Sequence, residues 1–100
     1  MTGARESDVE RVASAVVEQA LAVVALGGDL PEVLAARQIV RALESGAFCI
    51  TEGTPADGGT PLARILGRTP TASELTAIHQ AALIYARIVV AWHETHPVPA

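Results

Sequence analysis

Residues 71–94 read TASELTAIHQAALIYARIVVAWHE, and their apolar side chains recur at alternating steps of three and four residues. That spacing is typical of one face of an α-helix that packs against other helices. Thr71 and Glu74 fit a capping box, in which each side chain accepts a hydrogen bond from the other residue's backbone amide. The segment therefore predicts a helix over residues 72–94. Its inward row consists of Leu75, Ile78, Ala82, Tyr85, Val89 and Trp92.

A second apolar row runs beside the first on this predicted helix and leaves little of the circumference polar. Leu83 and Val90 fall even on the side that a surface helix keeps polar. A helix with so much apolar surface must pack against other elements on more than one side. The second row consists of Ala77, Ala81, Ile84, Ile88 and Ala91.

Residues 8–26 predict a first helix of the same apolar kind. Ser7 and Glu10 have the spacing of a capping box, and Gly27-Gly28 supplies a stop. The apolar residues extend well beyond one face, so we expect this helix to be buried on most sides. They are Val9, Val12, Ala13, Val16, Val17, Ala20, Leu21, Val23 and Val24.

Residues 30–45 predict a second helix, which begins with a cap at Asp29, carries Pro31 in its first turn and ends at Gly46. The apolar and charged residues separate onto two faces at helical spacing. The inward face consists of Leu30, Val33, Leu34, Val40 and Leu43, and the outward face of Arg37, Arg41 and Glu44.

A short apolar segment and a loop rich in glycine and proline follow this helix. Phe48, Cys49 and Ile50 are expected to fill the core. The loop over residues 52–61 contains three glycines and two prolines, a composition that predicts no regular element. It leads into a short helix over residues 61–66. Gly67 ends that helix.

The 100 residues, with a mass of 10.4 kDa, are expected to form one all-α domain over residues 1–100. A single cysteine forms neither an internal disulfide nor a cysteine-based zinc site. The first apolar region lacks the roughly 20 apolar residues of a membrane span. We therefore expect no membrane association and a cytoplasmic location.

The first and last helices together carry more apolar surface than one small bundle covers. We therefore predict that these helices form a homodimer interface, since two-fold pairs are the commonest oligomers. The alternative is that the chain itself buries one of them as a central helix.

No group of residues in the sequence predicts catalysis, a metal site or a cofactor. His93 and His96 are three residues apart, whereas the helical zinc motif needs histidines four apart. His79 has no serine or cysteine spaced to pair with it. Glu52 and Asp57 are expected to be solvated acids in the loop. We therefore expect a protein that is not an enzyme.

Gly58-Gly59-Thr60-Pro61, directly before the short helix, is a candidate anion site. Glycine lets a ligand approach the backbone closely, and amides at a helix N-terminus attract phosphate oxygens. Arg64 and Arg68 follow one turn apart. The alternative is a simple turn that links two core helices.

Arginine supplies every basic residue of the chain, whose net charge at pH 7 is −4. Arginine suits bidentate contacts with phosphate better than lysine does. Residues 33–71 hold four arginines against three acidic residues, and separate salt bridges are the alternative role for each. The four are Arg37, Arg41, Arg64 and Arg68.

From about Leu34 to Tyr85, the order of these short motifs resembles the RNA-binding domain of the phosphorylated adaptor for RNA export. The matching pieces are RALESGAFCITEG at 41–53, the two glycines at 58–59, LARIL at 62–66 and TPTASE at 69–74. The chain differs from that family at residues 54–57, where an arginine run is absent, and in its apolar last helix.

The resemblance implies a divergent all-α member that binds single-stranded RNA weakly. RNA would lie at Gly58, Gly59 and Thr60, and the same four arginines would supply positive charge. The alternative function is a helical homodimerisation or protein-interaction module without nucleic-acid binding.

Overall fold

A computed structural model describes residues 6–96 and confirms the all-α fold. Three long helices, one short helix and one 3-10 turn follow each other along the chain, and the described residues form no strand. These elements are α1 (Glu6–Gly28), α2 (Glu32–Ser45), η1 (Asp57–Gly59), α3 (Leu62–Leu66) and α4 (Ala72–Thr95). The predicted helix order is confirmed, and each helix end lies within two residues of its predicted position, although α1 is longer at both ends than predicted.

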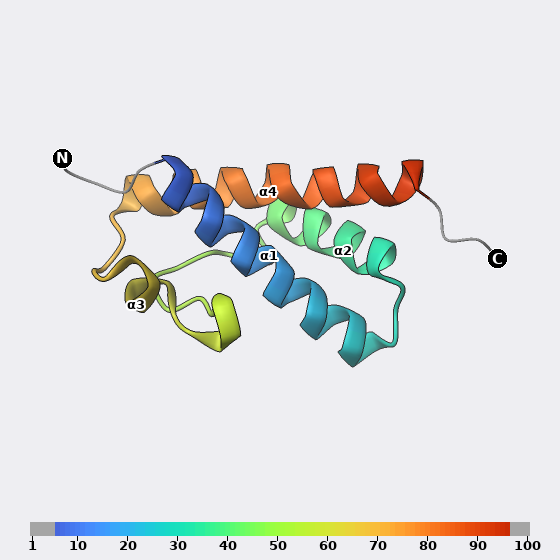
Figure 1. Ribbon diagram of the computed structural model, residues 1–100, viewed down its shortest axis with the longest axis horizontal. Coiled ribbons are helices and arrows are strands. Elements are labelled where there is room, and N and C mark those ends of the chain that lie inside the picture. The colour runs from blue at the N-terminus through green and yellow to red at the C-terminus, as the bar shows by residue number, and fades with distance from the viewer. Residues whose placement is uncertain (1–5, 97–100) are drawn as a thin grey trace.

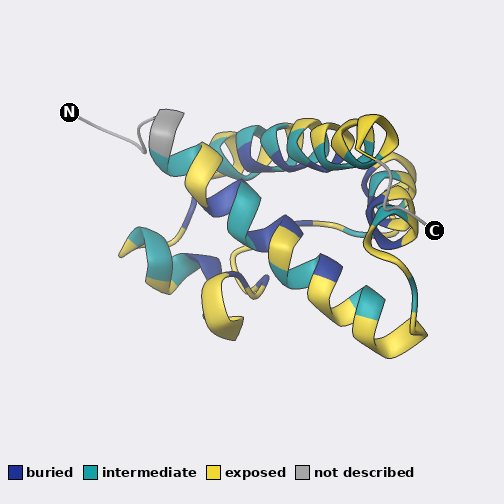
Figure 2. Ribbon diagram, turned by 45° about the vertical axis from the view of Figure 1, so that its right-hand side comes forward, coloured by how far each residue is buried: buried dark blue, intermediate teal, exposed yellow. Residues whose placement is uncertain are grey.

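Helix α4 is the element on which the bundle is built. Both α1 and α2 pack along it, while α3 and η1 pack against α1. Figure 1 shows α1 crossing below α4, with α3 and the glycine-rich loop on the far side of α1 from α2. The buried residues, drawn dark blue in Figure 2, lie on the sides of the helices that face one another.

Small side chains let the helices approach α4 closely. Ile78, Ala82 and Ala86 are the fully buried residues of α4. Ala86 was not part of the predicted inward row, and Trp92, which was, is exposed. The row therefore turns away from the bundle toward the end of the helix, because a seven-residue repeat drifts by about 20° per heptad around a straight α-helix.

Local backbone signals place several helix ends as predicted. The Thr71 hydroxyl oxygen accepts from the Glu74 amide at 3.2 Å, and a Glu74 carboxylate oxygen accepts from the Thr71 amide at 2.9 Å. This confirms the capping box of α4. Gly46 and Gly67 end α2 and α3 in the left-handed conformation, with φ of 81° and 77°, which glycine adopts without a steric penalty.

The two other predicted caps are wrong. Helix α1 already includes Glu6, so Ser7 is a helical residue rather than an N-cap, and the side chain of Ser7 lies outside what the structure describes. Helix α1 also continues through the two glycines expected to stop it. Helix α2 begins at Glu32 with Pro31 as its N-cap and no side-chain cap, because Asp29 lies in the preceding turn with φ of 51°.

The inward face of α2 is also shifted from the prediction. Leu34, which was predicted to face inward, is exposed, whereas Leu43 is buried as predicted. The segment after α2 fills the core only in part: Ile50 is buried, Phe48 is half-buried and Cys49 is exposed. The buried face of α2 consists of Ala35, Ala36, Ile39 and Leu43.

Helix α4 is, among the described residues, the one helix long and apolar enough to cross a membrane by length and composition alone. The expectation of no such segment considered only the first apolar region. Both neighbouring helices pack on α4, yet only 17% of its most apolar stretch is buried. Much of the apolar surface of α4 is therefore left open.

Candidate functional site

The glycine-rich loop is folded onto itself rather than left as an irregular linker. The Ala56 amide donates to the Thr60 carbonyl at 2.8 Å, and Ala56 is completely buried. Thr54 is buried as well, and its hydroxyl oxygen accepts from the Thr51 amide at 2.7 Å. Residues 57–59 form the 3-10 turn η1, which packs against α1. This three-residue turn, in which Gly58 has a non-helical φ of 64° and ψ of 18°, is the one helical element within residues 52–61, where the sequence predicted no regular element.

The two predicted phosphate-binding glycines lie in η1 at positive φ, 64° for Gly58 and 86° for Gly59. Both are exposed. However, the Gly59 amide donates to the Ala56 carbonyl at 2.7 Å, and the Thr60 amide donates to the Asp57 carbonyl at 3.1 Å. These two amides are therefore used inside the turn, beside the carboxylate of Asp57.

The first amides of α3 are occupied too. The Leu62 amide donates to the Thr54 carbonyl at 3.1 Å, and the Ala63 amide donates to the Glu52 carbonyl at 3.3 Å. An anion at a helix N-terminus binds to amides that lack a partner within the helix. In this loop, carbonyl groups of the chain already stand where a phosphate oxygen would bind.

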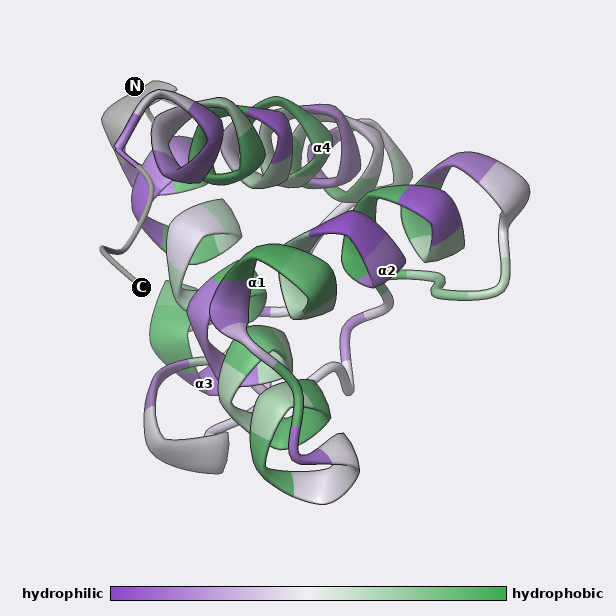
Figure 3. Cartoon of the chain, turned by 90° about the vertical axis from the view of Figure 1, so that its right-hand side faces the viewer, coloured by the Kyte–Doolittle hydropathy of each residue, from purple (hydrophilic) through white to green (hydrophobic). Residues whose placement is uncertain are grey.

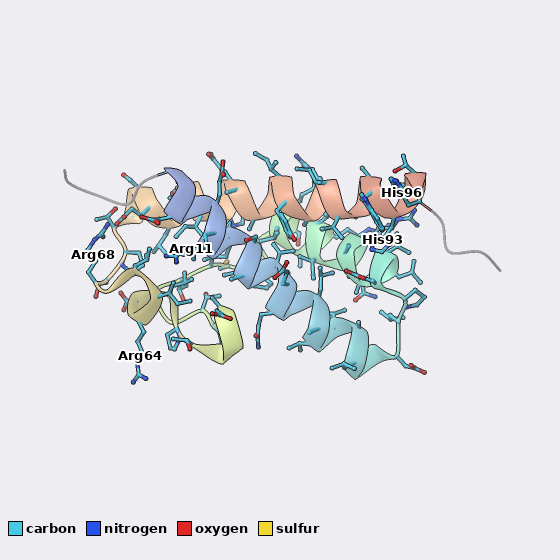
Figure 4. All side chains as sticks on the ribbon, in the orientation of Figure 1. Arg11, Arg64, Arg68, His93 and His96 are labelled. Atoms are coloured by element: carbon cyan, nitrogen blue, oxygen red, sulfur yellow. The ribbon has the colours of Figure 1, made fainter. Side chains whose placement is uncertain are left out.

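The four central arginines are not brought to one surface. Arg64 on α3 and Arg68 just after it lie at one end of the molecule, where Arg64 points away from the body (Figure 4). Arg37 and Arg41 lie on α2, in a groove between α2 and α4. Since α3 packs on α1 rather than along α2, the two pairs belong to different parts of the surface.

Acidic side chains pair with most of the arginines near these two places. Arg68 donates to both carboxylate oxygens of Glu74, which raises the pKa of Arg68. In the α2–α4 groove, Arg37 pairs with Glu94 at 3.3 Å.

Two further residues of that groove, Arg87 and Glu44, pair with each other at 2.6 Å. Arg41 and Arg64 remain exposed, and no ion pair is recorded for either within the described residues. Of the four arginines predicted for one RNA surface, two are thus in local ion pairs, and the other two lie on different parts of the surface.

The most distinctive surface of the molecule is instead apolar and lies on α4. Ile84, Ile88 and Trp92 are 57%, 58% and 54% exposed, on the side away from α1 and α2. Ile84 and Ile88 belong to the predicted second apolar row, whereas Trp92 was predicted to face inward. Ala81 of the second row is half-buried and also packs against the core. We call this side of the helix the outer α4 face, and it consists of Ala77, Ala81, Ile84, Ile88, Ala91 and Trp92.

The C-terminal half of α1 carries a second, smaller exposed apolar surface. Val23 is 61% and Leu26 84% exposed. Figure 3 shows α1 as apolar along most of its length, and Figure 2 shows its last turns as exposed. The prediction that α1 is buried on most sides therefore holds only for its first half, where Val12, Val16 and Val17 are buried.

The histidines of the last turns have separate surroundings. His93 Nε2 lies 3.5 Å from a Glu32 carboxylate oxygen, and the His96 ring stacks on Trp92 with centroids 4.5 Å apart. Figure 4 shows both at the end of α4. Over residues 6–96 no group of His, Cys, Asp and Glu residues could hold a metal ion.

No protein-family model matches the chain, and no curated protein or solved structure matches it either.

Proposed function

We propose that this protein is a small helical self-association module, in which two copies pair through the outer α4 face. The observation that carries the proposal is the row of three large apolar side chains, Ile84, Ile88 and Trp92, each more than half exposed. Burying such a side chain is worth about 1.5–3 kcal/mol. A pair of copies would bury two such rows.

The arrangement of large and small residues on this face favours a second copy as the partner. Ala77 and Ala81 occupy the first half of the face, and Ile84, Ile88 and Trp92 the second. An antiparallel pair related by a two-fold axis lays the bulky half of each helix on the alanine half of the other. Large side chains then meet small ones, which allows close helix packing without voids. The steps of four and three residues along the face suit such a helix pair.

Two charge substitutions on the outer face test the pairing. The unmodified protein is expected to sediment as a dimer at micromolar concentration, and the double variant Ile84→Glu, Ile88→Glu as a monomer of 10.4 kDa. Leu26→Glu is the matched control, because Leu26 is an exposed apolar residue of α1 outside this face. The control should remain a dimer.

Two outcomes would contradict the proposal. One is an unmodified protein that sediments as a monomer at micromolar concentration. The other is a monomer that binds phosphatidylcholine vesicles unless Ile84 and Ile88 are replaced, which would assign the face to a membrane.

Single-stranded RNA binding stays a prediction based on the motif resemblance. It predicts that the fluorescence polarisation of a labelled RNA single strand rises when the protein is added at low salt. It also predicts that this rise is lost in the double variant Arg64→Ala, Arg68→Ala. The amides of Gly59, Thr60, Leu62 and Ala63 and the guanidinium of Arg68 already have partners within the chain. Absence of the rise at micromolar protein would exclude RNA binding at this loop and leave self-association.

A further inference from the structure

A groove between α1, α2 and the folded loop has the size and lining of a small-molecule site. It encloses about 340 Å³, within the range of roughly 300–1,000 Å³ typical of ligand pockets. Helix α1 supplies one wall, helix α2 the other, and Phe48, Thr54 and Pro55 close one end. The apolar wall residues are Val16, Ala20, Val23, Val24, Ile39 and Ala42.

The lining contains no charge among the described residues that form it. An ionised ligand would lose its water in such a groove without gaining an ion pair, which is unfavourable. The lining thus discriminates against nucleotides, carboxylates and amines. It favours a ligand that is neutral and mostly apolar.

Three neutral polar side chains give the groove a limited hydrogen-bonding capacity. Gln19 stands on the α1 wall and Gln38 on the α2 wall, and each amide offers both a donor and an acceptor. The hydroxyl oxygen of Thr54 is already engaged by the Thr51 amide. The two glutamines therefore suit one hydroxyl, carbonyl or amide group on an otherwise apolar molecule.

We propose that this groove binds an uncharged, largely apolar small molecule with a single polar group. The site is separate from the outer α4 face, because it lies between α1 and α2. Its occupation therefore does not depend on self-association.

The experiment uses Nile red, an uncharged dye whose fluorescence rises in apolar surroundings. It is carried out on the Ile84→Glu, Ile88→Glu variant, so that the outer α4 face does not capture the dye. Decanol and decanoate, which share a chain length but differ in charge, then compete with the dye. We expect saturable binding of one dye per chain and displacement by decanol at a concentration at least tenfold below that of decanoate.

Matched substitutions on α1 locate the binding. Ala20→Phe fills the groove, whereas Ala22→Phe places the same ring on an exposed position outside it. Val23→Asp puts a charge at the groove edge without disturbing the core, and Leu26→Asp puts it one turn away. The two groove variants should weaken dye binding at least tenfold, and the two controls less than twofold.

Three results would overturn the proposal. They are dye binding that does not saturate, equal displacement by decanoate and decanol, and equal losses in the groove and control variants. The dye experiment uses a variant in which self-association is removed. A negative dye result therefore does not contradict the pairing through α4, and absence of pairing does not contradict ligand binding in this groove.

Discussion

The guanidinium of Arg68 donates hydrogen bonds to both carboxylate oxygens of Glu74, and the same carboxylate accepts a hydrogen bond from the Thr71 amide at the first turn of α4. One acidic side chain thus caps the helix and fixes the connection from α3. An arginine that the sequence offers as a phosphate ligand serves instead to join two helices.

Removal of the Thr71 hydroxyl should destabilise α4 at its start. Thr71→Ala removes the hydroxyl that accepts the hydrogen bond of the Glu74 amide, and loss of an N-cap costs about 1 kcal/mol. Urea unfolding measures the change. Thr76→Ala, on the exposed side of the same helix, is the control and should change stability by less than about 0.5 kcal/mol. An equal loss in both variants would show that the cap contributes nothing specific.

Truncation of Leu62 should be the most damaging change in the loop region. Leu62 is completely buried and begins α3, and a buried Leu→Ala change costs about 2–5 kcal/mol. Leu26→Ala, at a site that is mostly exposed, should cost less than about 0.5 kcal/mol. Thermal unfolding of the two variants compares them directly. A loss below about 1 kcal/mol for Leu62→Ala would mean that α3 is not part of the cooperative core.

The hydrogen bond from Tyr85 to Glu18 should make stability fall at high pH. Burial first, and then this 3.0 Å bond, raise the pKa of Tyr85 above its ordinary value of 10.0. The neutral phenol is thus favoured in the folded state. Its contribution is complete below about pH 10 and disappears as the pH rises through the raised pKa.

Tyr85→Phe removes both the bond and the titration. The urea midpoint at about pH 8 should fall slightly, by the equivalent of about 0.5–1 kcal/mol for a hydrogen bond near the surface. Between about pH 9 and pH 11 the midpoint of the variant should decline less steeply than that of the unmodified protein. Parallel declines would exclude Tyr85 as the source of the alkaline loss.

Pairing through the outer α4 face should make thermal stability depend on protein concentration. When folded chains associate and unfolded chains do not, mass action raises the melting temperature with concentration. The melting temperature of the unmodified protein should therefore rise over a hundredfold concentration range. That of Ile88→Glu should stay constant. A constant value for the unmodified protein would contradict stable pairing.

The sequence predicted the features that depend on neighbouring residues. The helix order, the Thr71–Glu74 capping box and the stops at Gly46 and Gly67 all follow from the chemistry of a few adjacent groups. The caps at Ser7 and Asp29 were wrong although the residue types fit. A cap also needs the backbone to leave the helix at that position, and tertiary packing influences where it does so.

Features that depend on distant segments could not be predicted in the same way. The spacing of apolar residues predicts apolar rows along α4, but it does not predict which of these rows packs against α1 and α2. The bundle buries Ala82 and Ala86 because small residues fit the crossings, and it leaves Ile84 and Ile88 outside. The pairing of Arg37 with Glu94, 57 positions apart, likewise has no local signal. This pairing is one reason why the predicted arginine cluster is divided.

The folded loop has a practical consequence for engineering the chain. Its composition is that of a linker, which would ordinarily be chosen to receive a fused domain or new chain ends. Yet a cut between Thr54 and Leu62 would remove the short covalent connection between the two partners of a hydrogen bond that anchors α3, so that this bond would have to form at a larger entropic cost. At the exposed Gly27 of α1, by contrast, no atom lies within 4 Å of an added Cβ, so a side chain can be introduced there without a steric clash.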